Sequence, residues 1–431
     1  METKERQKTA TYQPDLYVKS IPGFMTTVPQ SERCLTGAHG IQDRQSTVSP
    51  AVHVIRGCEA ILAHRKMLIE FSRRCGQPGT MEDLTYFLSK PGLLTRIPNL
   101  LLVVKHKNLM VAELTVEDLE GALFLYEYSV MGIGLRAFAT NDRSGRGTML
   151  ALPFQRLKVA AIASRVLLDQ GAHVMTLSFR VGSEAVNRDS ADGQTMEPIH
   201  GDKEDIRAFR LAPSPRATAD WTRREREIPG YLALKESYDA TLAGVGVKTR
   251  RNLRYYRRRA EAELGCALVT DVKISETELK SLNQQCMYPV ADRVALWRFR
   301  TMRELMEPVV LGVKDKDGRW LSLLGGRRHE GRMEILWQMN RDGLHAYSLS
   351  TVMRSYCIEE EVARGTKRLY LEGGTPHSLH HSFVREELVD LVVMRRSWMA
   401  KAMRKLVTYR VGTDNELADI LKSKNFKWYP C

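Results

Sequence analysis

The sequence predicts an α+β fold in which a mixed central sheet is flanked by helices, and three observations lead to this expectation. Short apolar runs typical of strands follow one another between about 100 and 130. Two helix-like stretches, at about 153–170 and 348–364, each end at a glycine that is followed by another strand-like run. The order of these elements recurs along the chain, which indicates an internal duplication of the fold.

The composition is that of a globular protein, and it limits the classes of function. With 431 residues the chain is too long for one ordinary core and suggests two domains. No run approaches the ~20 apolar residues that a membrane span needs, and the charged N-terminus lacks the apolar segment of a secretory signal. The seven cysteines are scattered without a Cys-x-x-Cys pair, so we expect reduced thiols and neither disulfides nor a zinc site. We therefore expect a cytoplasmic protein.

The first half of the chain is expected to hold a flexible arm and one domain. Residues 1–50 are polar and aperiodic, which is typical of an arm, and residues 51–180 form the first domain. Apolar residues at helical spacing predict a helix over about 54–74, and Thr80–Asp83 resembles the capping box of a short second helix. Further elements are expected in this order: strands at 100–104, 111–116 and 122–130, a helix at 153–170 and a strand at 173–179.

The second half repeats this order after an irregular segment. Residues 181–230, and above all the polar stretch 181–226, are interpreted as a linker or long surface loop. Residues 231–431 form the second domain, which opens with a helical stretch at 231–264 that Gly265 ends. The following elements are expected: helices at 276–287 and 293–306, strands at 309–314, 320–325 and 333–339, a helix at 348–364 and a strand at 368–372.

The segment Lys248–Arg259 is densely cationic, with seven basic residues among twelve. Helical spacing turns Leu253 and Tyr256 inward and places four arginines along one side: Arg250, Arg254, Arg257 and Arg258. One interpretation is a solvated face paired with nearby acids such as Glu261 and Glu263, and the other is a surface that binds an anion. Nucleic acid is one such anion, but no helix-turn-helix, zinc finger or RNP-like signature accompanies the run, so we favour the phosphate of a cofactor or carrier. The candidate substrate- or phosphate-binding residues are Arg250, Arg251 and Arg254.

Two glycine-containing loops lie between a strand and a helix, where backbone amides and the helix dipole favour a phosphate. The first loop, 142–147, offers Arg143, Gly145, Arg146 and Gly147. The second loop, 341–346, follows this glycine–arginine pattern less well and offers Arg341 and Gly343. Arginines add charge-assisted donors to such a loop, but the alternative interpretation is a solvent-exposed turn with incidental arginines.

The first loop and its surroundings resemble the N-acetyltransferase (GNAT) superfamily, in which an Arg/Gln-x-x-Gly-x-Gly/Ala loop grips the pyrophosphate of acyl-CoA at a helix N-terminus. Gly145 and Gly147 fill the two small positions, whereas Asp142 stands where arginine or glutamine is expected. Because an aspartate repels a pyrophosphate, either Arg143 and Arg146 compensate for it or the first domain has lost CoA binding. The resemblance implies two tandem GNAT-like domains that use acetyl-CoA or another acyl-CoA as donor.

A second resemblance covers about 240–410. The stretch 248–254, the Gly325-Gly326 strand end and the segment Gly365–Gly374 are similar to the CelD-like acyltransferases of bacterial cellulose and exopolysaccharide clusters. Those are double-GNAT proteins related to the FemAB aminoacyltransferases. Glu372 replaces the aspartate that is usual at this strand end, and the aromatic-Lys pair that often follows the glycines is absent.

Glu372, His377 and Tyr347 are the candidate catalytic residues. GNAT chemistry needs a base or water relay that deprotonates an amine or hydroxyl, and backbone donors that polarise the thioester carbonyl. His377 belongs to a group of three histidines within 377–381. We interpret this group as a polar loop and expect no metal, because no cysteine or carboxylate nearby completes a ligand set.

Three hypotheses follow for the function. The leading one is a GNAT acyltransferase that moves an acyl group from acyl-CoA to an amine or hydroxyl of a small molecule, sugar or envelope precursor. We expect direct transfer without a covalent enzyme intermediate, because no Ser/His/Asp triad or Cys/His dyad is recognisable in the sequence. The second hypothesis keeps the fold but uses aminoacyl-tRNA as donor, which gives the basic segment an RNA-binding role. The third is a non-catalytic, polyanion-binding protein on a GNAT scaffold.

Overall fold

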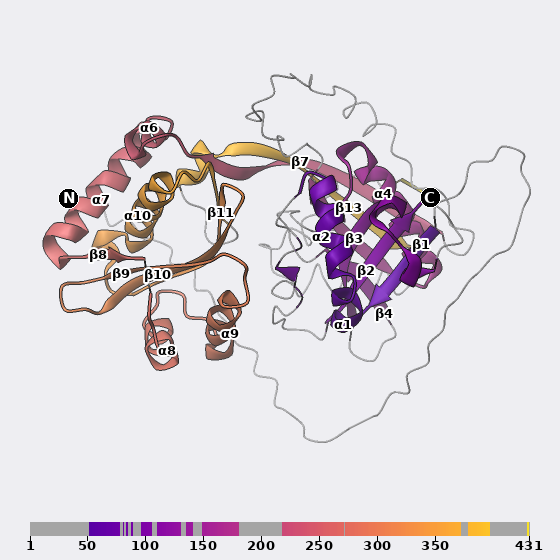
Figure 1. The fold of residues 1–431 in the computed structure, drawn as a ribbon, viewed down its shortest axis with the longest axis horizontal. Helices are drawn as coiled ribbons and strands as arrows, with labels where there is room; N and C mark the ends of the chain where they lie inside the picture. The colour runs from indigo at the N-terminus through magenta and orange to yellow at the C-terminus, as the bar shows by residue number, and fades with distance from the viewer. Residues whose placement is uncertain are drawn as a thin grey trace, which may run out of the picture. The chain divides into compact units, whose positions relative to one another are not determined.

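The computed structural model is built around one mixed sheet with helices on both faces, which confirms the predicted α+β fold (Figure 1). Among the described residues the sheet has 14 strands, and twelve of them follow the order β1-β2-β3-β4-β6-β13-β7-β12-β11-β10-β9-β8. The structure describes residues 51–77, 81, 83–84, 88, 96–105, 110–130, 135–140, 149–180, 218–270, 272–371, 378–396 and 429–430.

The elements between residues 51 and 180 form what we call the first repeat. They are β1 (Ala51–Arg56), α1 (Cys58–Leu62), α2 (Arg65–Arg74), β2 (Arg96–Val104), β3 (Leu119–Val130), β4 (Leu135–Ala139), β5 (Met149–Leu150), α4 (Arg156–Asp169) and β6 (Val174–Arg180). Strands β1 to β4 pair in antiparallel order, and β6 joins β4 in parallel. A parallel pair needs a crossover, which α4 provides.

The elements between residues 267 and 371, the second repeat, have the same order and pairing as the first repeat without the short strand β5. They are β8 (Ala267–Val269), α8 (Glu276–Gln284), α9 (Asp292–Met302), β9 (Pro308–Lys314), β10 (Trp320–His329), β11 (Arg332–Asn340), α10 (Leu349–Ala363) and β12 (Arg368–Leu371). The pairs are again antiparallel until β12, which lies parallel to β11 after the crossover through α10. The predicted internal duplication is therefore confirmed, while the domain boundaries themselves stay a prediction.

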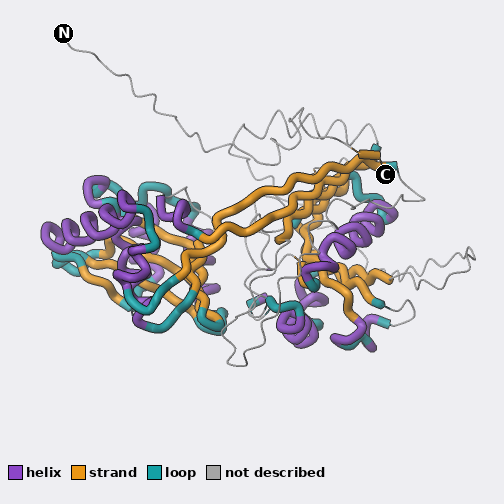
Figure 2. Tube along the Cα trace, turned by 90° about the horizontal axis from the view of Figure 1, so that it is seen from above, coloured by secondary structure: helices purple, strands orange, loops and turns teal. Residues whose placement is uncertain are grey.

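Two long strands join the repeats within the sheet. The strand β13 (Val384–Arg395) pairs with β6 of the first repeat and with β7 (Ala219–Ala233), and the end of β7 pairs with β12 of the second repeat (Figures 1 and 2). Asp390 of β13 is buried at this junction, where its carboxylate accepts hydrogen bonds from Ser178 Oγ at 2.7 Å, Arg224 Nη2 at 2.8 Å and Arg226 Nε at 2.8 Å. One carboxylate thus connects three strands.

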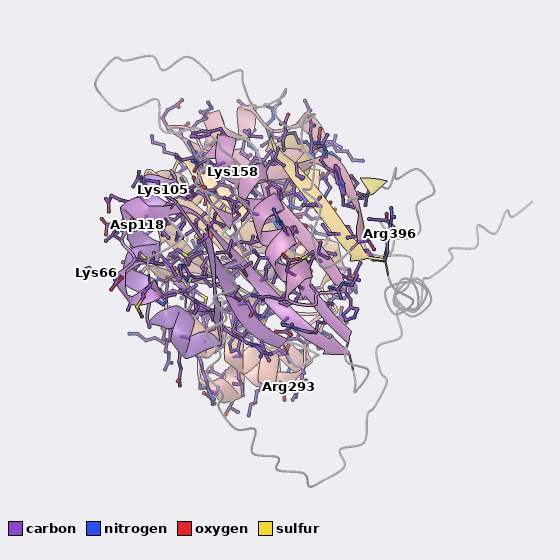
Figure 3. The ribbon with its side chains drawn as sticks, turned by 90° about the vertical axis from the view of Figure 1, so that its right-hand side faces the viewer. Lys66, Lys105, Asp118, Lys158, Arg293 and Arg396 are labelled. Carbon is purple, nitrogen blue, oxygen red and sulfur yellow. The ribbon has the colours of Figure 1, made fainter. Side chains whose placement is uncertain are left out.

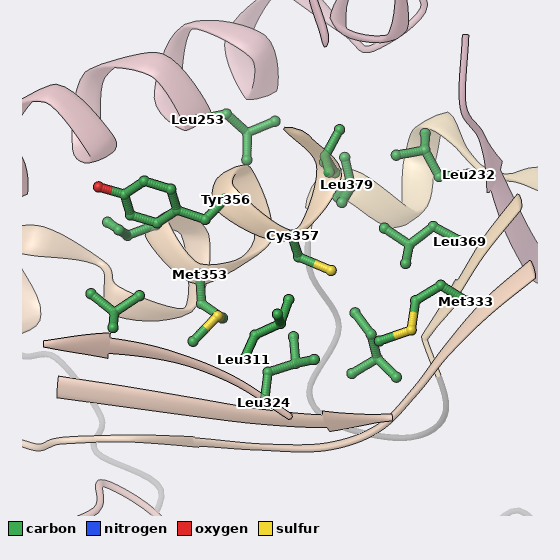
Figure 4. Close-up of a cluster of buried hydrophobic side chains, with 14 of the residues drawn as sticks. Leu232, Leu253, Leu311, Leu324, Met333, Met353, Tyr356, Cys357, Leu369 and Leu379 are labelled. Carbon is green, nitrogen blue, oxygen red and sulfur yellow. The ribbon is translucent and has the colours of Figure 1, made fainter. Parts of the chain in front are cut away.

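Alternating side chains give each repeat two cores, one on each face of its sheet. In the second repeat, α8 and α9 cover one face and pack on Trp320, Leu323 and Trp337. The other face is covered by α10 and by α7 (Val247–Leu264), as Figure 4 shows for Leu253, Tyr356 and neighbouring residues. In the first repeat, α1 and α2 cover one face and α4 covers the other. Exposed charged side chains such as Lys66, Lys158 and Arg293 lie at the periphery (Figure 3).

Several sequence-based assignments are wrong, each for an identifiable reason. Residues 54–56 belong to β1, because the run 51–56 pairs along its length with β2 although its apolar residues also fit helical spacing. The expected strand at 111–116 is replaced by two 3-10 turns, η1 (Val111–Glu113) and η2 (Val116–Asp118), which connect β2 to β3. Residues 219–230 of the predicted linker, and 231–233 of the predicted helical stretch, form β7.

Candidate functional site

The loop from Arg341 to Ser348 connects β11 to α10 and is fixed by backbone hydrogen bonds at its start. Arg341 N donates to Leu321 O at 2.9 Å, and Asp342 N donates to Gln285 O at 2.7 Å. Gly343 follows with φ of +77°, a left-handed conformation that glycine adopts without strain. The loop is therefore held against β10 and α8 and turns sharply before the helix begins.

Ser348, the residue before α10, has an uncommon backbone conformation. Its φ of 46° and ψ of 59° lie in the left-handed region, and among the described residues the only other residue with positive φ that is not glycine is Glu330. This conformation costs about 1 kcal/mol or more in a residue with a side chain. The Ser348 hydroxyl does not cap the helix, but lies 2.8 Å from Thr351 Oγ1. The first amides of α10 thus have no side-chain cap, and such amides, together with the helix dipole, suit an anion.

Tyr347, one of the predicted catalytic residues, ties this loop to the basic helix α7. Its hydroxyl donates to Glu263 Oε2 at 3.0 Å, and this bond raises the pKa of the phenol. Arg259 completes the contact: its Nε donates to Glu263 Oε1 at 3.0 Å, its Nη1 donates to Ala346 O at 3.2 Å, and its guanidinium lies 5.1 Å from the centre of the Tyr347 ring. Proton transfer by Tyr347 would first have to break the bond to Glu263, so its catalytic role stays a prediction.

The cations of α7 divide into two groups. In the first, the side chains pair within the protein: Arg254 contacts Asp239 at 2.6 Å, and Arg257 contacts both Glu261 at 2.9 Å and Glu359 at 2.8 Å. The second group has no ion pair with any described residue and remains available to an anion; it contains Arg250 and Arg251, and also Lys248 and Arg258. Of the three predicted phosphate-binding residues, Arg254 is therefore already paired, although its pair is exposed and weak.

A buried arginine on α10 was missed by the sequence-based interpretation. Arg354 is 9% exposed, and neither its Nε nor its Nη1 atom finds a hydrogen-bond partner among the described residues. It lies near His380 of the turn η5 (Ser378–Ser382), whose pKa is lowered first by burial and then by Arg354. A signal was present in the sequence, because Arg354 interrupts the apolar run of α10 between Met353 and Tyr356.

Three buried cysteines, Cys266, Cys286 and Cys357, are not set up as nucleophiles. Burial raises the pKa of the Cys266 and Cys357 thiols, and it raises that of Cys286 to about 11. A thiol with a raised pKa is a poor source of thiolate at neutral pH. In the part of the chain that the structure describes, no group of three histidine, cysteine or acidic side chains is arranged to hold a metal ion. No helix within the described ranges has both the length and the apolar character needed to cross a membrane.

The remaining predicted site residues lie outside the described residues. They are the first-loop residues Arg143, Gly145, Arg146 and Gly147 and the catalytic candidates Glu372 and His377. A surface cavity of about 570 Å³ lies elsewhere, between the segment before α8, the end of α9 and β9, and is lined by residues such as Lys273, Phe299 and Arg303. We do not place the chemistry there, because its lining contains neither a histidine nor a carboxylate.

No protein-family model matches the chain, and no curated protein matches it at a significant level. Among solved structures, a tandem GNAT protein from the clavulanic acid biosynthesis pathway is 11% identical, with a TM-score of 0.42 over 80% of this chain and 99% of that chain. L-PGS from Bacillus licheniformis is 10% identical, with a TM-score of 0.41 over 78% of this chain and 94% of that chain. FemX is 8% identical, with a TM-score of 0.41 over 72% and 95% of the two chains. These values describe a likeness of fold and assign neither a family nor an activity to the chain.

Proposed function

We propose that the protein is a GNAT-type acyltransferase that transfers an acyl group from acyl-CoA to an amine or hydroxyl, with the acyl-CoA bound at the second repeat. The observation that carries this proposal is the loop 341–348, which holds Ser348 in a strained conformation and leaves the first turn of α10 without a side-chain cap. In the superfamily that the sequence resembles, the pyrophosphate of acyl-CoA binds at this point of the fold. Backbone strain kept at a helix N-terminus supports a role in binding.

The residues around the loop have distinct roles in this proposal. The first amides of α10 and the side chain of Arg341 bind the pyrophosphate, and Gly343 allows the turn. The contacts of Arg259 and Glu263 with Tyr347 and Ala346 keep the loop in place. Among the described residues, pairing between β11 and β12 ends at Ile335 and Leu371 while β11 continues to Asn340. Backbone N–H groups of 336–340 on that edge are thus available to polarise a thioester carbonyl, whereas Asn340 O already accepts a hydrogen bond from Met287 N.

The proposed reaction is a direct transfer. The nitrogen or oxygen of the acceptor attacks the thioester carbonyl, the carbon–sulfur bond breaks, and the departing thiolate takes up the proton that the acceptor loses. Glu372 and His377 remain the proposed bases, since each follows β12 closely in sequence. The raised pKa values of the buried cysteines support a mechanism without a thiol intermediate.

Thermal unfolding with acetyl-CoA tests the proposal and the choice of repeat. Acetyl-CoA should raise the unfolding midpoint of the wild type, by an amount that follows RT ln(1 + [L]/Kd). Arg341→Ala should weaken this response, whereas the matched control Arg319→Ala, an exposed arginine of the same repeat, should leave it unchanged. If Arg143→Ala with Arg146→Ala abolishes the response and Arg341→Ala does not, the first repeat binds the cofactor. The absence of a response to acetyl-CoA and to longer acyl-CoAs would contradict the proposal.

A second candidate function, transfer from aminoacyl-tRNA, is favoured by one observation. Arg250 and Arg251 are among the cations of α7 that lack an ion pair among the described residues, and backbone phosphates are natural partners for them. A strong, salt-sensitive response to tRNA that Arg250→Ala with Arg251→Ala removes, without any response to CoA esters, would favour this function. The same response to heparin as to tRNA would instead favour a non-catalytic polyanion-binding protein.

A further inference from the structure

Arg354 carries a charge that the described part of the chain does not compensate. Burial lowers the pKa of its guanidinium to about 10, so the side chain remains a cation at neutral pH. The residue is buried, with 9% of its surface exposed, and two of its nitrogen atoms, Nε and Nη1, lack a hydrogen-bond partner among the described residues. A buried, unpaired charge is costly, and such a group therefore needs an explanation.

Two other buried or half-buried arginines of the same repeat differ from Arg354, because each is paired with a carboxylate. Arg327 lies 2.7 Å from Asp83 Oδ2 through Nη1 and 2.8 Å from Glu334 Oε2 through Nε. Arg328 donates to both carboxylate oxygens of the fully buried Glu361, at 3.0 and 3.1 Å from Nε. Both arginines have carboxylate partners, whereas Arg354 has none among the described residues.

Among the described residues, the charged or titratable groups that act on His380 of η5 are all basic: Arg354 itself, His381 of η5 and Arg385 at the start of β13. Besides burial, the Cys357 thiol acts on the pKa of Arg354 and raises it, and no carboxylate among the described residues does so. A region with unused donors and an excess of positive charge is complementary to an oxyanion.

We propose that Arg354, with His380 beside it, anchors an anion-binding subsite in the second repeat that holds a carboxylate or phosphate group of a ligand. The planar guanidinium presents two parallel N–H donors to either oxyanion, which a point charge such as lysine cannot do. His380 is half-buried and His381 is exposed, so η5 reaches from Arg354 to solvent. Arg354 is the sixth residue after Ser348, which corresponds to a rise of about 9 Å along α10. The subsite is therefore distinct from the loop 341–348 and does not depend on acyl-CoA being the donor.

The test measures thermal unfolding of the full chain with increasing inorganic phosphate or sodium acetate, at an ionic strength held constant with sodium chloride. The wild type should show a saturable rise in its unfolding midpoint with at least one of these anions, and the larger response distinguishes phosphate from carboxylate. In Arg354→Met the half-saturating concentration should rise at least tenfold. Arg354→Lys keeps the positive charge but not the two parallel N–H donors, and should retain part of the response.

The variants also differ without added anion, which separates a binding role from a structural one. Arg354→Met should unfold at a higher temperature than the wild type, because it removes a buried charge that no described residue compensates. The matched control Arg328→Met should unfold at a lower temperature, because it leaves the Glu361 carboxylate buried and unpaired. The proposal is overturned if the wild type shows no saturable response, if Arg354→Met responds as the wild type does, or if Arg354→Met is destabilised or fails to fold.

Discussion

The buried carboxylate of Asp390 allows a quantitative test of how the two repeats are joined. Asp390 is 4% exposed and accepts hydrogen bonds from Ser178, Arg224 and Arg226. Asp390→Asn keeps the shape of the side chain but removes its charge, so that two arginine side chains, 27% and 21% exposed, lose their counter-ion. Breaking a buried ion pair costs about 3–5 kcal/mol. Because both arginines can turn partly towards water, we expect a loss near the lower limit, about 3 kcal/mol.

Urea unfolding followed by circular dichroism measures this loss. With a dependence on urea of about 3 kcal/mol per molar, the midpoint should fall by about 1 M. The matched control is Asp239→Asn, which breaks another Asp–Arg pair whose side chains are 80% and 44% exposed. An exposed pair contributes about 1 kcal/mol or less, so the control should shift the midpoint by about 0.3 M at most. Equal midpoints for the two variants would refute the structural role assigned to Asp390.

Two further variants test packing and titration. Gly325→Ala should destabilise the protein by about 1–3 kcal/mol in the same urea assay, because its Cβ would lie 2.2 Å from Trp337 Cε2. The control Gly246→Ala, with no atom within 4 Å of its Cβ, should be close to neutral. A neutral Gly325→Ala would show that the Trp337 ring is not held in place. His173 has its pKa lowered by burial and by Arg395 and Arg136, so the folded state binds fewer protons than the unfolded state, and stability should fall as the pH drops below about 6.5. His173→Gln should reduce this dependence between pH 7 and pH 5, and an unchanged dependence would mean that other groups cause it.

Local signals in the sequence were sufficient to predict the positions of most helices and strands of the second repeat. The helix α10 with Gly365 after it, and the strands β9 and β11 with their apolar alternation, lie within a few residues of their predicted positions. Long-range pairing was not visible in the same way. The strand β7 is rich in charges, because Arg224 and Arg226 pair with Asp390 across to β13, and charged residues are typical of loops rather than inner strands. For that reason most of β7 is interpreted as a linker from the sequence. The strand β13 is not predicted either, because its partners β6 and β7 lie far from it in the sequence.

The candidate site was predicted only in part, for a related reason. Arg341, Gly343 and Tyr347 were recognisable because the loop between a strand and a helix has a local pattern. The ion pairs that engage part of α7, such as those of Arg257 with Glu261 and Glu359, depend on packing against α10. The unpaired state of Arg354 likewise depends on which groups surround it in the fold. Such properties cannot be obtained from spacing along one chain.

Hydrogen–deuterium exchange of the full chain, with and without saturating acetyl-CoA, tests whether acyl-CoA binds at the second repeat, because it reports both binding and its location. We expect slower exchange in peptides that cover 341–352, where the loop after β11 meets the first turn of α10. Peptides around the separate cavity near the end of α9 should exchange as before. Unchanged exchange over 341–352 at saturating acetyl-CoA, or protection confined to 272–303, would show that acyl-CoA does not bind at this loop.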